Sequence, residues 1–538
     1  MTSGPHAQMI DDGASRTRAP FPWWILFGGV LLACIYLPTL ATRFDFVDDG
    51  NLVYPSSPMP LGPRLHWVWE KIVANYTILG PFRPVLWCHW ELEAEAFGGR
   101  SIYWRLARLG WTCVAAGMFL WLMRELGIRP TAALAAIALA MWNPYRNEIW
   151  TSLTLAEGVA MPYALAALVC ALRAGRSAKP WRWDLLGVLC MLAALGCKNT
   201  FAALVPAQVY LRVVSDESDF FGGLRRHGRR SGVLALSLLL PATHYVYFVA
   251  HWHRGQYAVQ GPSWTQGERI LHTIIGAISP EYVGIGLVAA ICALVINRYA
   301  LRRELDIREY RESTKSGFAN PDGGPRYRAI LVAGLLLLTA GLGVYLPINA
   351  MSGRYAIPAA WGVDLMVAAL LSAVLQLCKQ RTAKVVFTAF ACGLVLVAVA
   401  NVGRQQKVAA RAQMLWDSLE WVEERVPAGA CVAWQCSPTL GVEEGVHFNW
   451  HLQGRGRKKV SVVLVDQQDE PISRPELPMS REAPKKPDFL ITGASISPGA
   501  GWQLERVVRV GYWKDRRSFV CSVWTPAHDG YVADALKK

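Results

Sequence analysis

The sequence is poor in charged residues for its length. Only 18% of its 538 residues are Asp, Glu, Lys or Arg, whereas 53% are hydrophobic, and the mean hydropathy is +0.22. A typical soluble domain carries about 25% charged residues, so this composition excludes an ordinary soluble protein of this size. Several runs of about 18 or more residues are almost free of charge, which is long enough to cross a bilayer as a helix.

The sequence also lacks the patterns of metal-binding and nucleic-acid-binding proteins. Its 12 cysteines show no metal-ligand spacing, and most lie in or near apolar segments, where cysteine usually serves as a small hydrophobe. Cys431, Cys436 and Cys521 lie in a more polar region and leave room for one disulfide if that region is outside the cytoplasm. No zinc knuckle or basic repeat accompanies the net charge of +15, so the excess of base indicates cytoplasmic loops and lipid phosphates rather than nucleic acid.

The apolar runs predict a polytopic membrane protein. A polar tail, residues 1–20, precedes a first span at 21–41, which is too long for a removed signal peptide and lacks the small-residue cleavage pattern, so we interpret it as a retained anchor. A long loop, 42–100, follows it. Ten further spans are expected at about 102–123, 131–144, 149–172, 184–197, 201–214, 232–250, 281–299, 329–347, 356–378 and 385–402.

The distribution of basic residues predicts the orientation. Arg16 and Arg18 in the tail place the N-terminus in the cytoplasm. Loops on that side carry basic clusters, for example within 173–182 and 225–230, whereas the opposite short loops hold isolated cations. Eleven spans then put the C-terminal part outside, on the same side as the loop 42–100.

The composition changes at about residue 403. Residues 404–426 read as an amphipathic helix, and five strand-like runs follow, near 431–434, 460–465, 489–492, 504–510 and 519–524. The expected fold is therefore an α-helical membrane domain, 21–402, with about eleven transmembrane helices, followed by a small soluble α/β domain, 403–538, outside the membrane. No sequence repeats are present.

The loop 42–100 begins with two adjacent carboxylates, Asp48 and Asp49, directly after the first span. A carboxylate at a membrane surface can accept a proton from an acceptor hydroxyl or hold a divalent cation, although the sequence requires no metal. The alternative is a solvated helix end, where Asp is common. Further along the loop, Leu65 to Val73 mixes aromatic and charged residues in a way that suits a helix lying in the membrane interface.

Two further acids lie on the same side of the predicted topology. Glu148 lies in the loop before the span predicted at 149–172, and Glu157 lies about two turns into that span. A carboxylate at this depth is costly in hydrocarbon and usually faces a cavity or a partner. Glu157 therefore either lines a site or forms a structural ion pair.

Four residues on this side are candidates for binding a phosphate. Arg83 precedes a proline that fixes the backbone beside it, and Lys198 lies between two short apolar runs. Arg354 and Tyr355 come just before the tenth span, where an arginine beside a tyrosine suits a lipid-linked phosphate. Arg83 can instead extend to lipid headgroups, and Lys198 can be an ordinary loop lysine.

These candidates combine acids and cations at one membrane surface. Transfer of a sugar from a polyprenyl phosphate needs both, because cations stabilise the departing phosphate and the acceptor hydroxyl or amide needs a base. The interpretation is an enzyme whose partners are a lipid-linked sugar donor, an acceptor and the bilayer.

The order of several short motifs resembles that of the membrane-embedded GT-C glycosyltransferases, in the branch that contains bacterial polytopic transferases and TMTC-type protein O-mannosyltransferases. The matching stretches are, in chain order, Phe46-Val47-Asp48-Asp49, Phe82-Arg83-Pro84-Val85, Asn143-Pro144 to Trp150 with Glu148, Leu195-Gly196-Cys197-Lys198, and Gly353-Arg354-Tyr355 with Pro358. The resemblance implies that the first-loop Asp is the catalytic base, that the donor is a polyprenyl-phosphate-linked sugar and that the reaction inverts the sugar carbon.

The chain departs from this family in three places. Asn199 stands where the family often has Glu, and an arginine usual early in the fourth span is absent, with Thr154 near that place. A small α/β tail replaces the tetratricopeptide tail of the TMTC type, so the resemblance does not extend to protein O-mannosylation. A bacterial inner-membrane transferase acting on a glycan, a lipid or a protein remains open.

Two other functions compete with this one. A transporter or lipid flippase is expected to have inverted repeats and charges at mid-membrane, whereas this chain has no repeat and its polar candidates gather on one face. A non-enzymatic scaffold that presents the C-terminal domain leaves the acids incidental. The leading expectation is an inverting glycosyltransferase.

Overall fold

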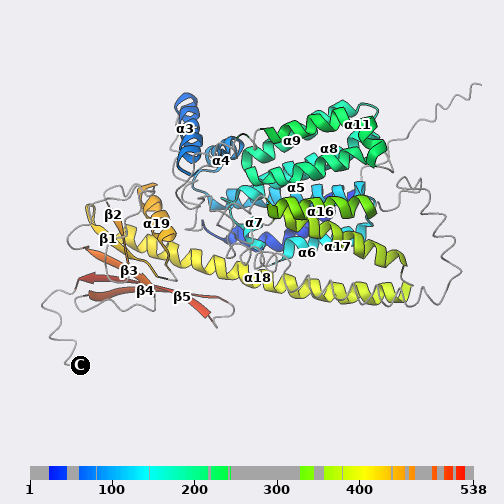
Figure 1. The fold of residues 1–538 in the computed structure, drawn as a ribbon. Helices are drawn as coiled ribbons and strands as arrows, with labels where there is room; N and C mark the ends of the chain where they lie inside the picture. Colours follow the sequence, from blue (N-terminus) through cyan, green and yellow to red (C-terminus); the bar gives the residue numbers. More distant parts are fainter. Residues whose placement is uncertain are drawn as a thin grey trace, which may run out of the picture.

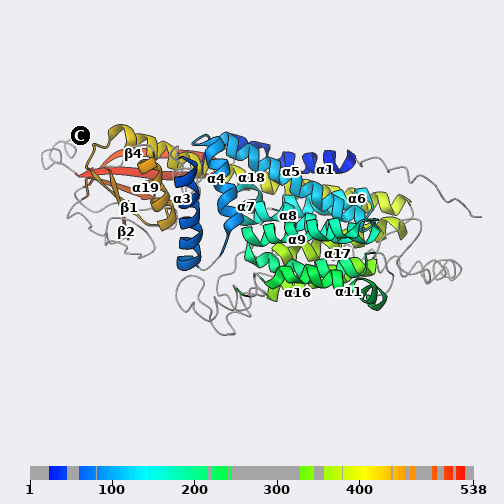
Figure 2. The same ribbon diagram turned by 90° about the horizontal axis from the view of Figure 1, so that it is seen from above.

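The computed structural model describes residues 23–44, 60–79, 82–143, 146–215, 220–239, 243, 327–343, 357–377, 380–437, 440–454, 460–466, 487–493, 502–512 and 517–526. Most of these residues are helical. They form a bundle, from which one long helix runs to a C-terminal β-sheet (Figure 1). A view at right angles shows the bundle helices again side by side along the same direction (Figure 2).

The helices of the bundle are mostly apolar, and from α5 to α10 they follow one another with short connections. In chain order they are α1 (Trp23–Ala33) with its 3-10 continuation η1 (Cys34–Ala41), α5 (Ser101–Glu125), α6 (Pro130–Trp142), α7 (Asn147–Thr151), α8 (Ala156–Arg176), α9 (Pro180–Cys197), η3 (Asn199–Leu204), α10 (Val205–Val213), α11 (Phe220–Ala235), η4 (Leu236–Leu238), α16 (Tyr327–Gly343) and α17 (Ile357–Leu377). Between η1 and α5 lie α3 (Leu61–Ala74), the single-turn π-helix η2 (Asn75–Leu79) and α4 (Pro84–Phe97).

Three helical stretches are long and apolar enough to cross a membrane, namely Trp23–Ala41, Ser101–Glu125 and Ala156–Arg176. Shorter apolar helices are Pro130–Trp142, Tyr327–Gly343 and Ile357–Ala373. Among the described residues these are far fewer than the eleven spans expected from the sequence. A helix rises about 1.5 Å per residue, so a helix as short as α6 reaches only about 20 Å, less than the hydrocarbon thickness of about 30 Å.

Several expected spans differ from the helices that form. The span expected at 149–172 is interrupted, because residues 152–155 separate α7 from α8 without helical structure. The span expected at 385–402 and the amphipathic helix expected at 404–426 are parts of one helix, α18 (Gln380–Arg425), of 46 residues. The span expected at 281–299, and most of the one at 232–250, lie outside the described residues.

The helix α8 lies at the centre of the bundle. Most of its side chains are buried, and it packs against α5, α9 and α10. Small residues permit a close approach, since a Cβ added at Gly187 of α9 would lie 3.3 Å from the Cβ of Cys170. Close packing through small residues is the usual way in which apolar helices associate where lipid surrounds them.

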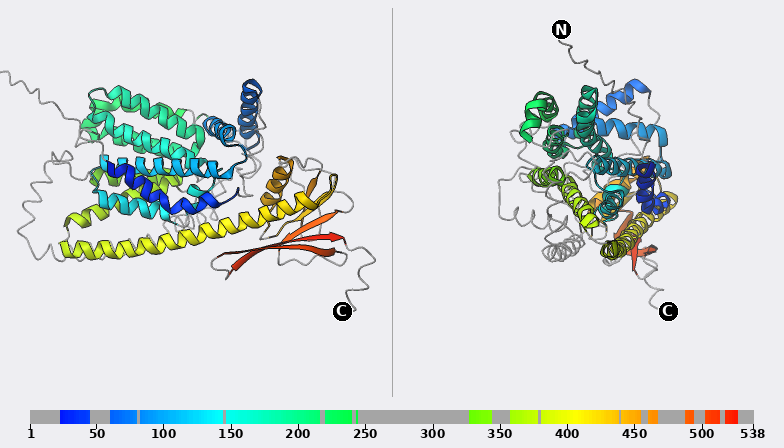
Figure 3. Two further views of the ribbon diagram at one scale, coloured as in Figure 1. Left: turned by 180° about the vertical axis from the view of Figure 1, so that it is seen from behind. Right: turned by 90° about the vertical axis from the view of Figure 1, so that its right-hand side faces the viewer.

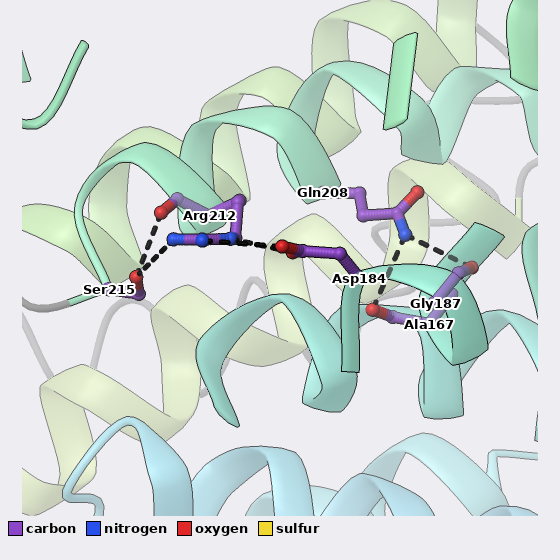
Figure 4. Close-up of polar contacts among 6 residues, drawn as sticks. All are labelled: Ala167, Asp184, Gly187, Gln208, Arg212 and Ser215. Atoms are coloured by element: carbon purple, nitrogen blue, oxygen red, sulfur yellow. Dashed lines mark hydrogen bonds and ion pairs between the residues drawn. The ribbon is translucent and has the colours of Figure 1, made fainter. Parts of the chain in front are cut away.

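Two polar side chains of α10 tie it to its neighbours inside the bundle (Figure 4). The fully buried Arg212 donates from Nε to Asp184 Oδ1 at 2.7 Å and from Nη1 to Ser215 Oγ at 3.3 Å. Gln208 Nε2 donates to the carbonyls of Gly187 at 3.2 Å and Ala167 at 3.5 Å. A buried charge is stable only when it is paired, so this cluster fixes α10 against α8 and α9.

The C-terminal region forms a five-stranded sheet in the order β2-β1-β3-β5-β4. The strand β1 (Cys431–Gln435) pairs in parallel with β2 (Ser461–Val465) and β3 (Phe489–Gly493), while β5 (Arg517–Pro526) pairs antiparallel with β3 and with β4 (Trp502–Tyr512). The five strands confirm the five runs predicted from the sequence. Between β1 and β2 lies α19 (Val442–Gly454), which the sequence does not predict.

The long helix α18 connects the bundle to the sheet and, together with α19, covers one face of it (Figure 3). Leu415, Leu419 and Val422 of α18 are buried in one apolar cluster with Val432 and Ile491 of the sheet. The helix passes without a break through residue 402, where the sequence separates membrane and soluble parts. The two parts are therefore joined by a helix rather than by a linker.

The three cysteines of this region are free thiols. Cys431 lies on β1 and Cys521 on β5, with β3 between them. Neighbouring strands lie about 4.8 Å apart, so the two strand spacings alone separate these residues by about 10 Å, and the register, which pairs Val432 with Phe489 and Cys521 with Gly493, displaces them further along the strands. Their separation is beyond the roughly 7 Å that a disulfide spans between Cα atoms. Cys436 directly follows β1 and is separated from Cys521 by the same strand. The disulfide that the sequence left open is therefore not formed.

Burial lowers the pKa of His447 on α19 to about 4 from its ordinary value of 6.5. Between these values the unfolded chain binds a proton that the folded domain does not accept, so the stability present above pH 6.5 is lost as the pH falls toward 4. A tenfold difference in proton affinity is worth about 1.4 kcal/mol, so the loss reaches about 3 kcal/mol. We expect thermal unfolding of the full chain in detergent at pH 7.5 and pH 5 to show about 2 kcal/mol of this loss, because pH 5 is about 1.5 units below the ordinary pKa.

The matched variant for this measurement is His447→Gln, whose side chain does not titrate. It is expected to unfold at a midpoint that changes much less between the two pH values. If wild type and variant lose the same stability on acidification, His447 is not the group that links folding to pH.

Candidate functional site

One end of the bundle faces the C-terminal sheet (Figure 1). At this domain-proximal end α5 and α8 begin, α9 ends, and η1 leads toward the acidic motif. Arg43 and Phe44, which follow η1, contact side chains of both the bundle and the C-terminal helices α18 and α19. Most of the described candidates from the sequence lie at this end.

The most conspicuous feature of the domain-proximal end is a buried ion pair. Lys198 Nζ lies 2.7 Å from Glu157 Oε1, and both side chains are less than one-tenth exposed. Glu157 belongs to the first turn of α8, and Lys198 is the residue directly after α9. The two sequence candidates, 41 positions apart along the chain, are therefore neighbours in space.

The helix ends favour this arrangement of charges. The N-terminus of a helix carries a partial positive charge that stabilises an acid such as Glu157, and the C-terminus carries a partial negative charge that stabilises a cation such as Lys198. Because α8 and α9 are consecutive antiparallel helices, these two ends meet. The sequence therefore predicts the residue types, and the helix packing brings them together.

Two arginines of α5 reach the same place. Arg105 donates to the carbonyl of Thr151 and, from Nη2, to the carbonyl of Arg43 at 3.0 Å, while Arg108 donates to the carbonyl of Leu153. Both arginines are buried. They donate hydrogen bonds to backbone carbonyls in and beside the non-helical segment 152–155, where no helical N–H group is available to these carbonyls.

Arg108 also lies directly beside the first turn of α8. A Cβ added at Gly158 would collide with the Arg108 guanidinium, so only glycine permits this approach next to Glu157. Neither arginine is among the candidates predicted from the sequence. The signal that could have found them is the presence of two basic residues, three positions apart, inside an otherwise apolar span, because ionisable residues in such spans usually mark a site.

Arg83 lies at the beginning of α4, beside the end of α9. It is close enough to Cys197 to act on it electrostatically, and Val85 fills the space that a side chain at Gly196 would occupy. The N-terminus of α4 thus packs on Gly196 and Cys197, the two residues that precede Lys198 in the chain. Arg83 therefore lies near Cys197, the neighbour of Lys198 in the chain, and Arg105 and Arg108 contact the segment that leads to Glu157.

Glu148 lies on α7 at the same end of the bundle, where it is exposed and is not part of the Lys198–Glu157 pair. Its neighbour Arg146 forms a second buried ion pair with Asp364 of α17, at 2.7 Å between Nη1 and Oδ2. Asn401 of α18 donates to the carbonyl of Trp142 at 3.0 Å nearby. These contacts hold the start of α7 between α17 and α18, and we assign them to the packing of the domain-proximal end.

The acidic motif itself begins just beyond the described part of the chain. Asp48, Asp49, Arg354 and Tyr355 all lie outside the described residues. The chain that leads to Asp48 is held firmly at Phe44, whose carbonyl accepts a hydrogen bond of 2.8 Å from Trp416 Nε1 and whose ring contacts Trp104 and His451. The described part of the chain before Asp48 therefore ends, at Phe44, at the domain-proximal end.

Around the Lys198–Glu157 pair, the charges of the described residues are mainly positive. Arg83, Arg105, Arg108 and Lys198 accompany the carboxylate of Glu157, whereas the carboxylates of Asp364 and Glu420 at this end are paired with Arg146 and Arg43, and the N-terminus of α8 adds its partial positive charge. Such a group suits an anion, above all a phosphate, which arginine and lysine bind most readily. In the described part of the chain, no group of three or more His, Cys, Asp and Glu side chains is arranged to hold a metal ion.

Comparison of the chain with models of known protein families and with curated proteins finds no match.

Proposed function

We propose that the protein is a GT-C-like glycosyltransferase, which moves a sugar from a polyprenyl-phosphate-linked donor to a glycan, lipid or protein acceptor at the outer face of a bacterial cytoplasmic membrane. The observation that carries the proposal is the buried Lys198–Glu157 pair with its flanking arginines. It puts a cationic group at the end of the apolar bundle where Phe44, four residues before Asp48 in the sequence, is held. The phosphate of a lipid-linked donor lies at the membrane surface, because its hydrocarbon chain remains in the membrane. Cations at the end of the apolar bundle are therefore placed to bind this phosphate.

In the proposed reaction the acceptor oxygen attacks the anomeric carbon of the sugar, and the bond from this carbon to the phosphate oxygen breaks. Asp48, or its neighbour Asp49, takes the proton of the acceptor hydroxyl. The electron pair of the broken bond goes to the phosphate, whose negative charge Lys198, Arg83 and Arg354 stabilise. Attack from the side opposite the leaving phosphate inverts the anomeric carbon.

Glu157 acts in this scheme as a positioning residue. Its carboxylate holds the Lys198 ammonium in place, so that the lysine faces the leaving group without searching among rotamers. Arg105 and Arg108 hold the segment 152–155 that leads to Glu157. They also place cations near the position where the resembling family has an arginine and this chain has Thr154, so α5 compensates for that departure.

The proposed topology has eleven spans with the N-terminus in the cytoplasm and the C-terminal domain outside. It agrees with the position of the basic loops, since Arg173 and Arg176 at the end of α8 bind Glu125 at the end of the bundle far from Lys198. The alternative is a transporter or a lipid flippase. It needs charges that change partners at mid-membrane, whereas the Lys198–Glu157 pair lies where α8 begins and α9 ends.

Deletion of the protein in its source cell tests this proposal. We expect one sugar to disappear from an envelope glycan, lipid or protein, and the matching polyprenyl-phosphate sugar to accumulate in lipid extracts, because its consumer is missing. Mass spectrometry of both fractions measures this, and complementation with the intact chain is the control. Unchanged acceptors together with unchanged lipid-linked sugars would contradict a transferase.

A further inference from the structure

The helix α3 carries an exposed apolar stripe that the proposed reaction does not use. Leu61, Leu65, Trp69 and Val73 follow one another at intervals of four residues and are 70%, 60%, 58% and 38% exposed. Residues four apart lie on one side of a helix, so the four side chains form a continuous strip. An exposed apolar stripe of this length indicates a contact with another protein or with a membrane.

The stripe is the uncovered part of a wider apolar face. Val68 and Ile72, which border it on the helix surface, are buried. The polar residues lie on the remaining side, where Arg64 binds Glu91 at 3.3 Å and Glu95 at 2.5 Å and so fastens α3 to α4. The protein therefore covers half of the apolar face and leaves the other half to something else.

The direction of α3 identifies what covers it. The helix lies at the domain-proximal end and runs across the direction of the bundle helices, both in Figure 1 and in the view at right angles in Figure 2. Helices such as α5 and α8, which are apolar enough to cross a membrane, define the membrane normal. A helix that crosses their direction at the end of the bundle lies parallel to the membrane surface.

The residues beside the stripe fit the surface of a bilayer. Trp69 belongs to the stripe, and Trp67 lies toward the polar side with the Lys71 ammonium 5.3 Å from the centre of its ring. Tryptophan and lysine gather where hydrocarbon meets headgroups. Exposed apolar side chains of α5, such as Ile102 and Leu106, begin at the same end of the bundle, so the lipid surface continues from the bundle toward α3.

We propose that α3 is an interfacial helix, whose stripe Leu61, Leu65, Trp69 and Val73 lies in the lipid leaflet on the side of the C-terminal domain. An amphipathic helix binds a membrane in this way, with its apolar face in the boundary between headgroups and acyl chains. Arg64 joins α3 to Glu91 and Glu95 of α4. The contact of the stripe with lipid therefore also holds α4 at a fixed depth in the membrane. Because Arg83 begins α4, the same contact sets the depth of Arg83 beside the end of α9.

Photocrosslinking of the full-length protein in phospholipid nanodiscs tests the proposal. p-Benzoylphenylalanine is introduced singly in place of Leu65 or Trp69, and intact-mass spectrometry after irradiation detects phospholipid adducts. Glu70 on the polar side of α3 is the matched control position, since its side chain is 62% exposed, and Leu31 in the first span is the positive control. All four positions are exposed, so the replacements leave the packing intact.

We expect lipid adducts at positions 65 and 69 at a level comparable to position 31 and at least tenfold above position 70. Equal yields at 65, 69 and 70 would overturn the proposal, and so would yields at 65 and 69 far below that at 31. Crosslinked dimers at these positions would assign the stripe to a second copy of the chain, and adduct-free crosslinks within the chain would assign it to another segment. The result does not depend on sugar transfer, so it holds or fails separately from the proposed function.

Discussion

Glu157→Gln is expected to destabilise the protein by about 3–5 kcal/mol, because it leaves the Lys198 ammonium buried without its counter-charge. The two side chains are 2.7 Å apart and almost fully buried, so water cannot replace the missing carboxylate. We expect the variant to unfold in detergent at a clearly lower temperature than the wild type. Adding Lys198→Met removes the isolated charge and should restore most of the stability, because an apolar pair of similar volume often replaces a buried ion pair without loss.

The matched control is Glu420→Gln. Its carboxylate lies 2.5 Å from Arg43, but both side chains are 40% exposed, so the same substitution is expected to cost at most about 1 kcal/mol.

The double variant Glu157→Gln with Lys198→Met separates structure from function, since it is expected to fold and yet to transfer little sugar without the Lys198 cation. A folded double variant with wild-type transfer would restrict the pair to a structural role.

Much of the fold could be predicted because it depends on local patterns. The run at 102–123 corresponds to α5, and the alternating runs after residue 430 correspond to the five strands. The predictions that were wrong concern where a helix ends, which depends on the residues that follow it and on its packing. The polar residues after Ala400 are typical of the end of a membrane span. This stretch contains no proline that would end the helix, and α18 therefore continues to Arg425.

The helix α19 was missed for a different reason. Its apolar residues Val442 and Val446, and Phe448 and Leu452, are spaced four apart as in a helix, but Gly445 and several polar residues interrupt the pattern. Gly445 is needed for packing, because a Cβ there would collide with Leu464 and crowd Trp434 of the sheet. The residue that weakens the helical signal is the one that allows the helix to approach the strands.

The sequence predicts which residues belong to the candidate site, but it does not predict which of them contact one another. Glu157 and Lys198 stand out as charges beside apolar runs, but their pairing depends on how α8 and α9 pack. Arg105 and Arg108 were hidden because a hydropathy window averages two charges into an apolar span. Each buried arginine needs a hydrogen-bond acceptor, and the acceptors here are the carbonyls of Thr151 and Leu153. These carbonyls are accessible because the helix is interrupted there, whereas the sequence predicts one continuous span.

Asp48→Asn is expected to lower sugar transfer by about 100- to 10,000-fold, the usual effect of removing a general base. Asparagine keeps the size and most of the hydrogen bonding of the side chain and removes its ability to take the acceptor proton. Binding of the donor phosphate depends on the cations and should change little, so the loss is expected in kcat rather than in KM. Glu70→Gln, an exposed acid of the same loop, is the control and should keep full activity.

The central claim is that carboxylates of the first loop and cations at the domain-proximal end act together on a lipid-linked sugar. The most direct test measures transfer from the polyprenyl-phosphate sugar identified in the deletion strain, using purified wild-type protein and the double variant Asp48→Asn with Asp49→Asn. The account predicts normal amounts of folded double variant and no detectable transfer. Wild-type transfer by that variant would contradict it.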